Sequence, residues 1–410
     1  MSRDTFRIAV RRFGPFESAI RKQWDAFEQA QRTGLHLDAA AMDLHELHDA
    51  LFDSDGLARG DLDVAFINTD WVAQANERHC LLDLNPMIRS SPPDGYPEAW
   101  PRSLLRLQDI DGRVLGLPYH DGPECLIYRT DLLNDPVEQA AYQARYGAPL
   151  RVPETWTEFR RIARHFHRPD EGLYGTVYAA YPDGHNTVYD FCLQVWTRGG
   201  ELTDAQGKLR LDTSHAREAL QFLRETVNDA TFVHPACREM DSVKSGLAFA
   251  AGEAALMVNW FGFASMAETI AESRVKGCVG VADIPHTDGA PGASLNIYWL
   301  LCIGAGSPHQ DVAWRFLRHC ASAEMDKLLT LEGAIGCRRS TWIDEDVNRI
   351  VPFYRAMERL HAGAREMPRM AQWPAVATVI DRMVLAAINT VAPIETIVAQ
   401  AQNEIVGILE

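Results

Sequence analysis

Four consecutive residues that could bind a polar solute, Asn68, Thr69, Asp70 and Trp71, follow an apolar strand expected over residues 61–67. Their amide, hydroxyl and carboxylate groups could hydrogen-bond a ligand, and the indole could cover its apolar face. Ligands of α/β proteins collect at the carboxyl ends of parallel strands. These four residues are therefore candidate binding residues, although Asp70 could instead cap the helix expected near Trp71.

A second polar group, His120-Asp121-Gly122-Pro123, separates two apolar runs over residues 114–117 and 125–128. This pattern predicts a strand, a bend and a strand. His120 and Asp121 could contact a ligand or could hydrogen-bond only within the bend. Cys125 lies close by and would be a nucleophile if a base reached its thiol. A cysteine that opens an apolar strand is more often buried and inert.

The composition excludes several classes of function. The chain has 410 residues, and 56 Asp plus Glu against 40 Lys plus Arg give a formal charge of −16, which disfavours nucleic acid as a partner. No apolar run approaches the ~18 residues of a membrane span. The eight cysteines lack metal-ligand spacing, and the common catalytic and phosphate-binding motifs are absent. We expect no cofactor and no metal, and a binding protein rather than an enzyme.

Strands and helices alternate along the sequence, which predicts an α/β fold with mostly parallel sheets. The length suits two domains. Expected strands cover residues 6–10, 35–38, 61–67, 174–180, 254–258, 279–284 and 297–303. One helix should follow Gly14-Pro15 and bury the stripe Phe16, Ile20, Trp24 and Phe27. Another should begin at a capping box formed by Thr155 and Glu158, and the chain after Ser307 should be largely helical.

No apolar segment of the signal-peptide type precedes the first expected strand. We therefore expect either that a signal peptide is missing from this chain or that the protein stays in the cytoplasm.

Several stretches together resemble the family 1 extracellular solute-binding proteins, the maltose-binding-protein-like receptors of ABC importers. They include Gly60-Asp-Leu-Asp-Val-Ala-Phe-Ile-Asn-Thr-Asp-Trp71, Asp111-Gly-Arg-Val-Leu-Gly-Leu-Pro-Tyr119, Leu126-Ile-Tyr-Arg-Thr-Asp-Leu-Leu133 and residues 153–159, 249–260 and 307–317. Each stretch is loosely defined alone, but they occur in the family's order over residues 6–400.

The resemblance implies a two-lobed, periplasmic-binding-protein-like fold of type II with a ligand cleft between the lobes. Lobe one would take residues 1–120 and 280–320, and lobe two residues 121–279 and 321–410, with hinge crossings near 120, 279 and 320. The implied function is the substrate-binding component of an ABC importer, which captures a sugar or polyol by hinge closure. Its partners would be the importer's membrane subunits, and it would act as a monomer in the periplasm or outside the cell.

The family's cleft positions fall on ten residues of this sequence: Asn68, Thr69, Asp70, Trp71, Tyr119, His120, Asp121, Tyr189, Trp260 and Trp373. Aromatic faces beside carboxylates and amides suit a sugar. Trp71, Trp260 and Trp373 could instead belong to the core.

Two alternatives remain open from the sequence. The first is an enzyme similar to thiaminase type I, which resembles this two-lobed scaffold and uses a cysteine nucleophile. In such an enzyme, Cys125 would be the nucleophile. The missing signal peptide would also fit a cytoplasmic, ligand-sensing member of the family.

Overall fold

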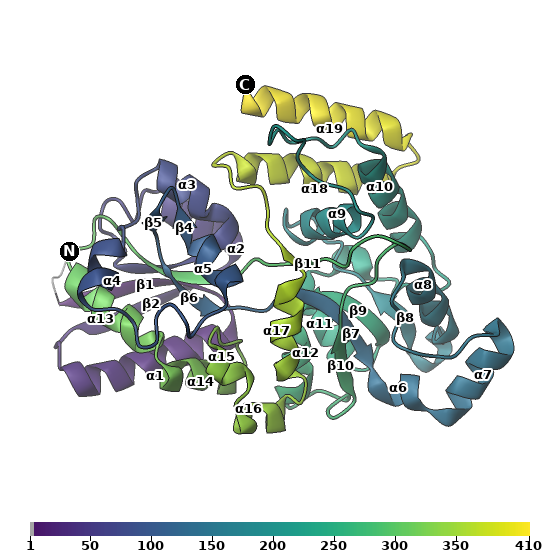
Figure 1. Ribbon diagram of the computed structural model, residues 1–410, viewed down its shortest axis with the longest axis horizontal. Helices are drawn as coiled ribbons and strands as arrows, with labels where there is room; N and C mark the ends of the chain where they lie inside the picture. Colours follow the sequence, from purple (N-terminus) through teal and green to yellow (C-terminus); the bar gives the residue numbers. More distant parts are fainter. Residues whose placement is uncertain (1–3) are drawn as a thin grey trace. The chain divides into compact units, whose positions relative to one another are not determined.

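A computed structural model describes residues 4–410, so Met1, Ser2 and Arg3 of the expected first lobe lie outside the described residues. The chain forms two compact units (Figure 1). Among the described residues, unit 1 comprises residues 4–122, Asn296–Glu358 and Arg369–Ala371, and unit 2 comprises Pro123–Leu295, Arg359–Pro368 and Gln372–Glu410. Each unit combines helices with a sheet, which confirms the predicted α/β class.

The chain passes between the units after Gly122, Leu295 and Glu358, and again on either side of the short segment Arg369–Ala371. The second and third positions differ from the expected crossings near 279 and 320. β10 (Val279–Ala282) pairs with β7 (Glu124–Arg129), so it belongs to unit 2. α14 (Ala323–Leu331) packs against α1 (Gly14–Gln31), so the residues after 320 remain in unit 1. Apolar periodicity predicts that a strand forms, but it does not say which strand will pair with it.

The main sheet of unit 1 has the strand order β2-β1-β3-β12-β6. β1 (Thr5–Arg11) pairs in parallel with β2 (His36–Met42) and with β3 (Val64–Asn68). β12 (Trp299–Ile303) runs antiparallel to β3 and to β6 (Leu117–His120). The sheet therefore departs from the expected parallel arrangement at one strand, β12.

α1 buries the predicted apolar stripe of unit 1. Pro15 occupies its first turn, where the missing N–H needs no partner, and Arg32 ends it in the left-handed conformation with φ of 50°. The ring of Trp24 stacks on Phe6 of β1 with centroids 4.7 Å apart. Burial of this apolar stripe holds α1 against the sheet. The stripe consists of Phe16, Ile20, Trp24 and Phe27.

The remaining elements of unit 1 are short. A two-stranded ribbon joins β4 (Asp109–Ile110) to β5 (Arg113–Val114). The helices are α2 (Leu44–His48), a π-helical turn (Asp49–Asp53), η2 (Thr69–Trp71), α3 (Val72–Glu77), α4 (Asn85–Ser90), α5 (Arg102–Gln108), α13 (Gln310–Cys320), α15 (Arg339–Trp342), α16 (Glu345–Ile350) and η5 (Tyr354–Ala356). α17 (Met357–Ala362) contains the boundary between Glu358 and Arg359.

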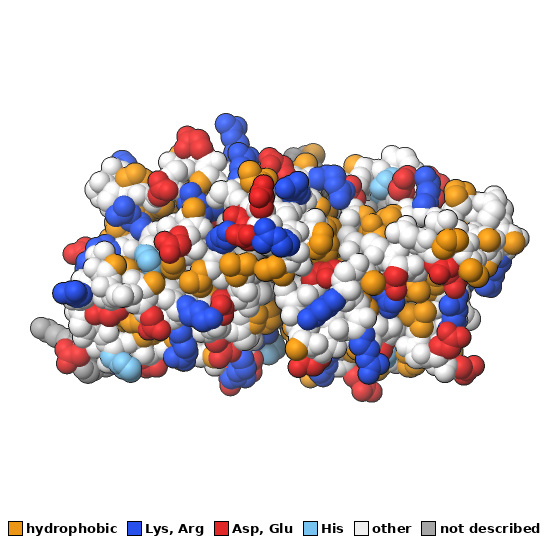
Figure 2. Space-filling model, turned by 90° about the horizontal axis from the view of Figure 1, so that it is seen from below, with side chains coloured by type: hydrophobic (Ala, Val, Ile, Leu, Met, Phe, Trp, Pro, Cys, Tyr) orange, Lys and Arg blue, Asp and Glu red, His pale blue; other side chains and the backbone are white. Residues whose placement is uncertain are grey.

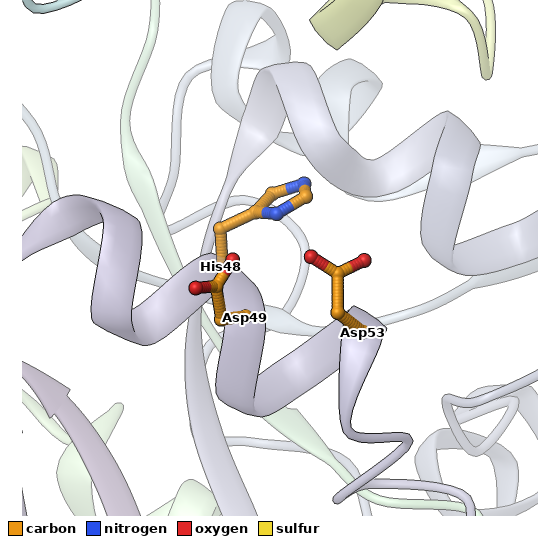
Figure 3. A group of neighbouring side chains, drawn as sticks. All are labelled: His48, Asp49 and Asp53. Carbon is orange, nitrogen blue, oxygen red and sulfur yellow. The ribbon is translucent and has the colours of Figure 1, made fainter.

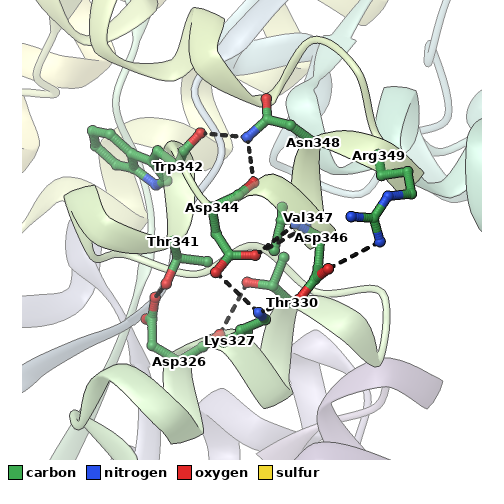
Figure 4. A network of polar contacts seen from close by, with 10 residues as sticks. All are labelled: Asp326, Lys327, Thr330, Thr341, Trp342, Asp344, Asp346, Val347, Asn348 and Arg349. Carbon is green, nitrogen blue, oxygen red and sulfur yellow. Dashed lines mark hydrogen bonds and ion pairs between the residues drawn. The ribbon is translucent and has the colours of Figure 1, made fainter.

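A buried carboxylate holds together the helices that follow β12 (Figure 4). Asp326 of α14 is only 4% exposed. Its Oδ1 accepts the N–H of Cys337 at 2.8 Å, and its Oδ2 accepts the N–H of Arg338 at 3.2 Å and the hydroxyl of Thr341 at 2.5 Å. One side chain thereby fixes the turn between α14 and α15.

The main sheet of unit 2 has the strand order β10-β7-β9-β8. β9 (Ala254–Trp260) is parallel to β8 (Tyr174–Val177) and antiparallel to β7, and β10 is antiparallel to β7. β8, β9 and β10 therefore run in one direction, and this sheet departs from the expected parallel arrangement at one strand, β7. Alternation of strands and helices along a sequence does not fix the direction in which each strand enters its sheet. A second, small sheet pairs β11 (Ser294–Leu295) with β13 (Ala364–Arg365).

The helices of unit 2 include the predicted capping box. α8 (Trp156–His165) begins where Thr155 Oγ1 accepts the N–H of Glu158 and Glu158 Oε2 accepts the N–H of Thr155, both at 3.2 Å. α9 (Asn186–Trp196), α10 (Ser214–Val227) and α18 (Trp373–Asn389) pack against one another. The others are α6 (Thr130–Asn134), α7 (Pro136–Tyr146), η3 (Pro169–Glu171), η4 (Cys237–Glu239), α11 (Ser242–Ala250), α12 (Phe261–Thr269) and α19 (Ile394–Leu409).

The surface carries charges of both signs. Figure 2 shows a face on which Lys and Arg side chains are interspersed with Asp and Glu, despite the net charge of −16. Among residues 4–410, no helix has both the length and the apolar character needed to cross a bilayer.

Candidate functional site

Three neighbouring strands of unit 1 place the predicted residues Asn68 and His120 on either side of Trp299. Trp299 begins β12 and is the register partner of Asn68 in β3 and of His120 in β6. Its side chain is partly exposed. The sequence does not show this proximity, because the three residues come from distant segments and the strand partners of residues 297–303 are not encoded in a local pattern.

Trp71 lies behind Trp299. It is 3% exposed, and its ring meets those of Trp299 and His48 edge-on at 6.0 and 5.2 Å. The indole is therefore part of the packing that supports Trp299, which favours the core interpretation of Trp71.

The polar side chains next to Trp71 have structural partners. Asn68 Oδ1 accepts the N–H of Asp70 at 3.3 Å and caps the turn η2. Thr69 Oγ1 accepts the N–H of Tyr298 at 3.1 Å, which joins this turn to the segment before β12. Thr69 thus helps to position the strand that starts at Trp299.

The end of β6 is fixed by the turn that Asp326 organises. His120 Nδ1 accepts the N–H of Ile335 at 2.9 Å, and the N–H of Asp121 donates to the Ile335 carbonyl at 3.0 Å. Burial lowers the pKa of His120 to about 3, against an opposing effect of Asp121. His120 is consequently neutral, with its ring proton on Nε2. Gly122, which ends this stretch of unit 1, has φ of 140°, a conformation that favours glycine.

Tyr119 belongs to the core of unit 1. It is 3% exposed, its ring lies 4.9 Å from that of Phe66, and its hydroxyl donates to Gln23 Oε1 at 2.8 Å. Its polar group therefore already has a buried protein partner.

In unit 2 the predicted residues Tyr189 and Trp260 lie together. Trp260 ends β9 and is partly exposed, whereas Tyr189 in α9 is 4% exposed. Their rings meet edge-on at 5.6 Å with an interplanar angle of 87°. Tyr189 holds the larger indole in place, and the partly exposed face of Trp260 is the one that a ligand could cover.

Two carboxyl groups beside this aromatic pair were missed from the sequence. Glu124 begins β7 directly opposite Trp260 and is 4% exposed. Burial and the neighbouring Asp190 raise the pKa of Glu124, and burial together with Asp183 raises the pKa of Asp190 to about 8. The only signal in the sequence is that Glu124 stands at the edge of an apolar run.

Trp373 begins α18 and is 1% exposed. Its Nε1 has no hydrogen-bond partner, and no ring contact joins it to Tyr189 or Trp260, within the described part of the chain. The structure therefore does not bring it into the pair that Tyr189 and Trp260 form.

Cys125 is fully buried and is the register partner of Asn259 in β9. Burial, together with the charge of Glu124, raises the pKa of its thiol. A buried thiol of raised pKa is a poor nucleophile, which contradicts the interpretation of Cys125 as a catalytic residue.

We expect iodoacetamide to leave Cys125 unmodified in the native protein at pH 7.5, because reagent cannot reach its thiol and little thiolate forms. Cys278, which is partly exposed, is the matched control and should be alkylated first. Peptide mapping by mass spectrometry over time measures both. Modification of Cys125 as rapidly as Cys278 would restore the enzyme interpretation.

His48, Asp49 and Asp53 form the one group within residues 4–410 whose ligand atoms, all within 4.8 Å of one another, could hold a metal ion (Figure 3). Both aspartates are exposed. His48 Nε2 is 3.1 Å from Gln74 Oε1, and Asp53 Oδ1 is 3.9 Å from Arg78 Nη2. These contacts account for the group as a surface cluster, and we assign no metal to it.

Comparison with known proteins gives a consistent family match. Residues 48–327 match the sequence profile of the bacterial extracellular solute-binding protein family. A probable ABC transporter-binding protein from Deinococcus radiodurans is 24% identical over 318 residues, which cover 76% of this chain and 71% of that protein.

Solved structures match the fold along nearly the whole chain. The T. maritima protein MalE3 with bound maltose has a TM-score of 0.85 at 23% identity, and the match covers 98% of each chain. An ABC transporter solute-binding protein from Agrobacterium radiobacter in complex with ribitol has a TM-score of 0.86 at 22% identity, again over 98% of each chain. These likenesses show that the fold is the one that the resemblance predicted.

Proposed function

This chain belongs to the bacterial extracellular solute-binding protein family, whose members are binding proteins of ABC transporters and not enzymes, and from that premise we propose that its ligand is a sugar or polyol. The protein captures this ligand by hinge closure and delivers it to the membrane subunits of its importer. It acts as a monomer in the periplasm or outside the cell.

One observation carries the proposal of a polyhydroxylated ligand. Of the ten tryptophans, eight are at most 5% exposed, and only Trp260 and Trp299 are partly exposed within the described residues. Each lies at an end of a strand, one in each unit, beside hydrogen-bonding side chains. Burial of an indole is the default, so an exposed indole next to polar groups suggests a surface kept for a ligand.

The neighbours of these two indoles suit hydroxyl groups. In unit 1 they are the amide of Asn68 and the neutral imidazole of His120, and in unit 2 they are the carboxyl groups of Glu124 and Asp190. Indoles cover the C–H face of a pyranose or an extended polyol, and amide and carboxyl groups bind its hydroxyls. The ligands in the solved relatives, maltose in one and ribitol in the other, belong to the same chemical class.

Calorimetric titration with maltose, glucose, ribitol, sorbitol and mannitol tests this proposal. We expect at least one compound to bind with a single-site isotherm. A complete absence of heat for an extended panel of saccharides and polyols would refute the carbohydrate part of the proposal.

Trp260→Ala should weaken binding of that compound about thirtyfold, equivalent to ~2 kcal/mol, because the substitution removes the apolar cover from the ligand. The effect on the thermal midpoint should be small, since the indole is already partly exposed. Calorimetry measures the affinity, and differential scanning measures the midpoint.

Trp260→Phe is the control, because it keeps an aromatic face and should recover much of the affinity. Equal losses of affinity and of folding free energy in Trp260→Ala would instead identify Trp260 as a core residue.

A further inference from the structure

Four carboxyl groups lie around the start of α9 in unit 2. Glu124 comes from β7, Asp183 from the loop before α9, Asp190 from α9 and Asp381 from α18. None of them forms an ion pair with a lysine or arginine within residues 4–410, whereas Glu138, Asp212 and Asp229 of the same unit each pair with an arginine. The described chain thus gathers carboxyl groups at this place without a lysine or arginine partner, although the imidazole of His185 favours the ionised form of Asp381.

Two of the four have evident structural roles. Asp183 Oδ1 accepts the N–H groups of His185 at 2.9 Å and Asn186 at 3.1 Å, which satisfies the amino end of α9. Asp381 accepts the hydroxyl of Thr187 and so ties α18 to α9. Neither role explains Glu124 or Asp190.

Glu124 is the unusual member. The residue is 4% exposed, and its Oε2 has no hydrogen-bond partner within the described chain. Directly opposite residues of an antiparallel pair point to the same face of the sheet, so the carboxyl lies on the face that carries the Trp260 ring. Asp190 is close enough to raise the pKa of Glu124, and it adjoins Tyr189 in α9. The unpartnered carboxyl therefore lies on the same face of the sheet as Trp260 and near Asp190.

A buried carboxyl oxygen without a partner is unfavourable in either protonation state, because an ionised group lacks a donor and a protonated one lacks an acceptor. The nearby carboxyl of Asp190 adds charge repulsion when both groups are ionised. A ligand group that donates several hydrogen bonds and carries positive charge removes both penalties together. An ammonium has three donors and a full charge, whereas a hydroxyl has one donor and no charge.

We propose that unit 2 recognises a cationic nitrogen on the ligand, so that the solute is an aminated sugar or amino polyol, with the nitrogen held by Glu124 and Asp190 beside Trp260. This inference rests on the proposed function and narrows its ligand class. The indole adds a cation–π contact to the same nitrogen. Desolvation and the neighbouring Asp183 raise the pKa of Asp190 to about 8, so we expect pairing with an ammonium to release a proton to the buffer near neutral pH.

Matched pairs of compounds test the inference by calorimetry at pH 7: sorbitol against 1-amino-1-deoxysorbitol, and glucose against glucosamine, with N-acetylglucosamine as the uncharged nitrogen control. The amine should bind at least about tenfold more tightly than its neutral counterpart. The binding enthalpy of the amine should differ between phosphate and Tris buffers, because the two buffers take up the released proton with different enthalpies of protonation.

Three variants distinguish recognition of the ligand's charge from a general loss of folding or binding. Glu124→Gln and Asp190→Asn should abolish the preference for the amine and the dependence of enthalpy on buffer. Asp212→Asn, an exposed change of the same kind in unit 2, should retain both. Thermal melts show which variants fold. If Glu124→Gln does not fold, Asp190→Asn still tests the proposal, because Asp190 is partly exposed and its replacement should be tolerated.

The outcomes are distinct. Neutral sugars or polyols that bind as tightly as their amines would overturn the cationic ligand and leave the proposed function intact. A preference that survives in both folded carboxyl variants would overturn the assignment to Glu124 and Asp190. Binding of no compound in the panel would refute the proposed function and this inference with it.

Discussion

Asp326→Ala is expected to lower the free energy of unfolding by about 3 kcal/mol, because it leaves buried N–H groups without an acceptor. The carboxylate accepts two backbone N–H groups and the Thr341 hydroxyl in a region where water does not replace it. Urea denaturation followed by circular dichroism measures the loss. The loss of order should extend to the end of β6, because the N–H of Ile335 in the same turn donates a hydrogen bond to His120.

Lys327→Ala is the matched control one residue away. Lys327 pairs with Asp344 at 2.9 Å and with Asp346 at 2.8 Å, in contacts that are partly exposed to solvent (Figure 4). Exposed ion pairs contribute little, so the midpoint of this variant should stay close to that of the wild type. If the two variants lost equal stability, the turn would not depend on the buried carboxylate.

Asp190→Asn should increase stability at alkaline pH by about 3 kcal/mol, roughly half of what the full pKa shift would give because the residue is partly exposed, and should change stability little near pH 4. The pKa of Asp190 is raised to about 8 from 3.8. A carboxyl whose pKa is raised by folding contributes its full stability below the unfolded pKa, and that contribution is lost as the pH rises through the folded pKa. The wild type should therefore lose stability between about pH 4 and pH 8, and the variant should have a flatter profile over that range.

The groups that face Asp190 come from several elements: Asp183 from the loop before α9, Glu124 from β7 and Tyr178 from the segment after β8. None of them is a base that would pair with the ionised form. Asp212→Asn is again the control, and its effect should have the opposite sign, because the hydrogen bond from Arg210 lowers the pKa of Asp212. Urea melts at pH 4, 6 and 8.5 measure both profiles. A gain for Asp190→Asn that is independent of pH would contradict the assignment.

Local patterns predicted the local structure well. The stripe of α1 and the capping box of α8 depend on neighbours within one or two turns, so the sequence contains all the information that they need. The direction and partner of each strand depend on residues far away. For that reason the antiparallel course of β12 and the assignment of β10 to unit 2 were not predicted.

The site was predicted less completely, for a physical reason. Residue type shows that a side chain could bind a ligand, but not whether packing has already covered it. Trp71 and Tyr119 have the right chemistry and are buried among aromatic neighbours, whereas Trp260 has the same chemistry and stays partly exposed. Glu124 was missed because nothing local to the sequence shows a charged side chain to be buried without a partner. Ligand contacts at all ten predicted positions stay predictions.

The two partly exposed tryptophans give the protein a built-in optical reporter. Acrylamide should quench the fluorescence of Trp260 and Trp299 far more than that of the other eight indoles, which are shielded. In Trp260→Phe the quenchable emission would come from Trp299 in unit 1, and in Trp299→Phe from Trp260 in unit 2. A pair of single replacements would therefore follow solvent access to each unit separately, without any external label.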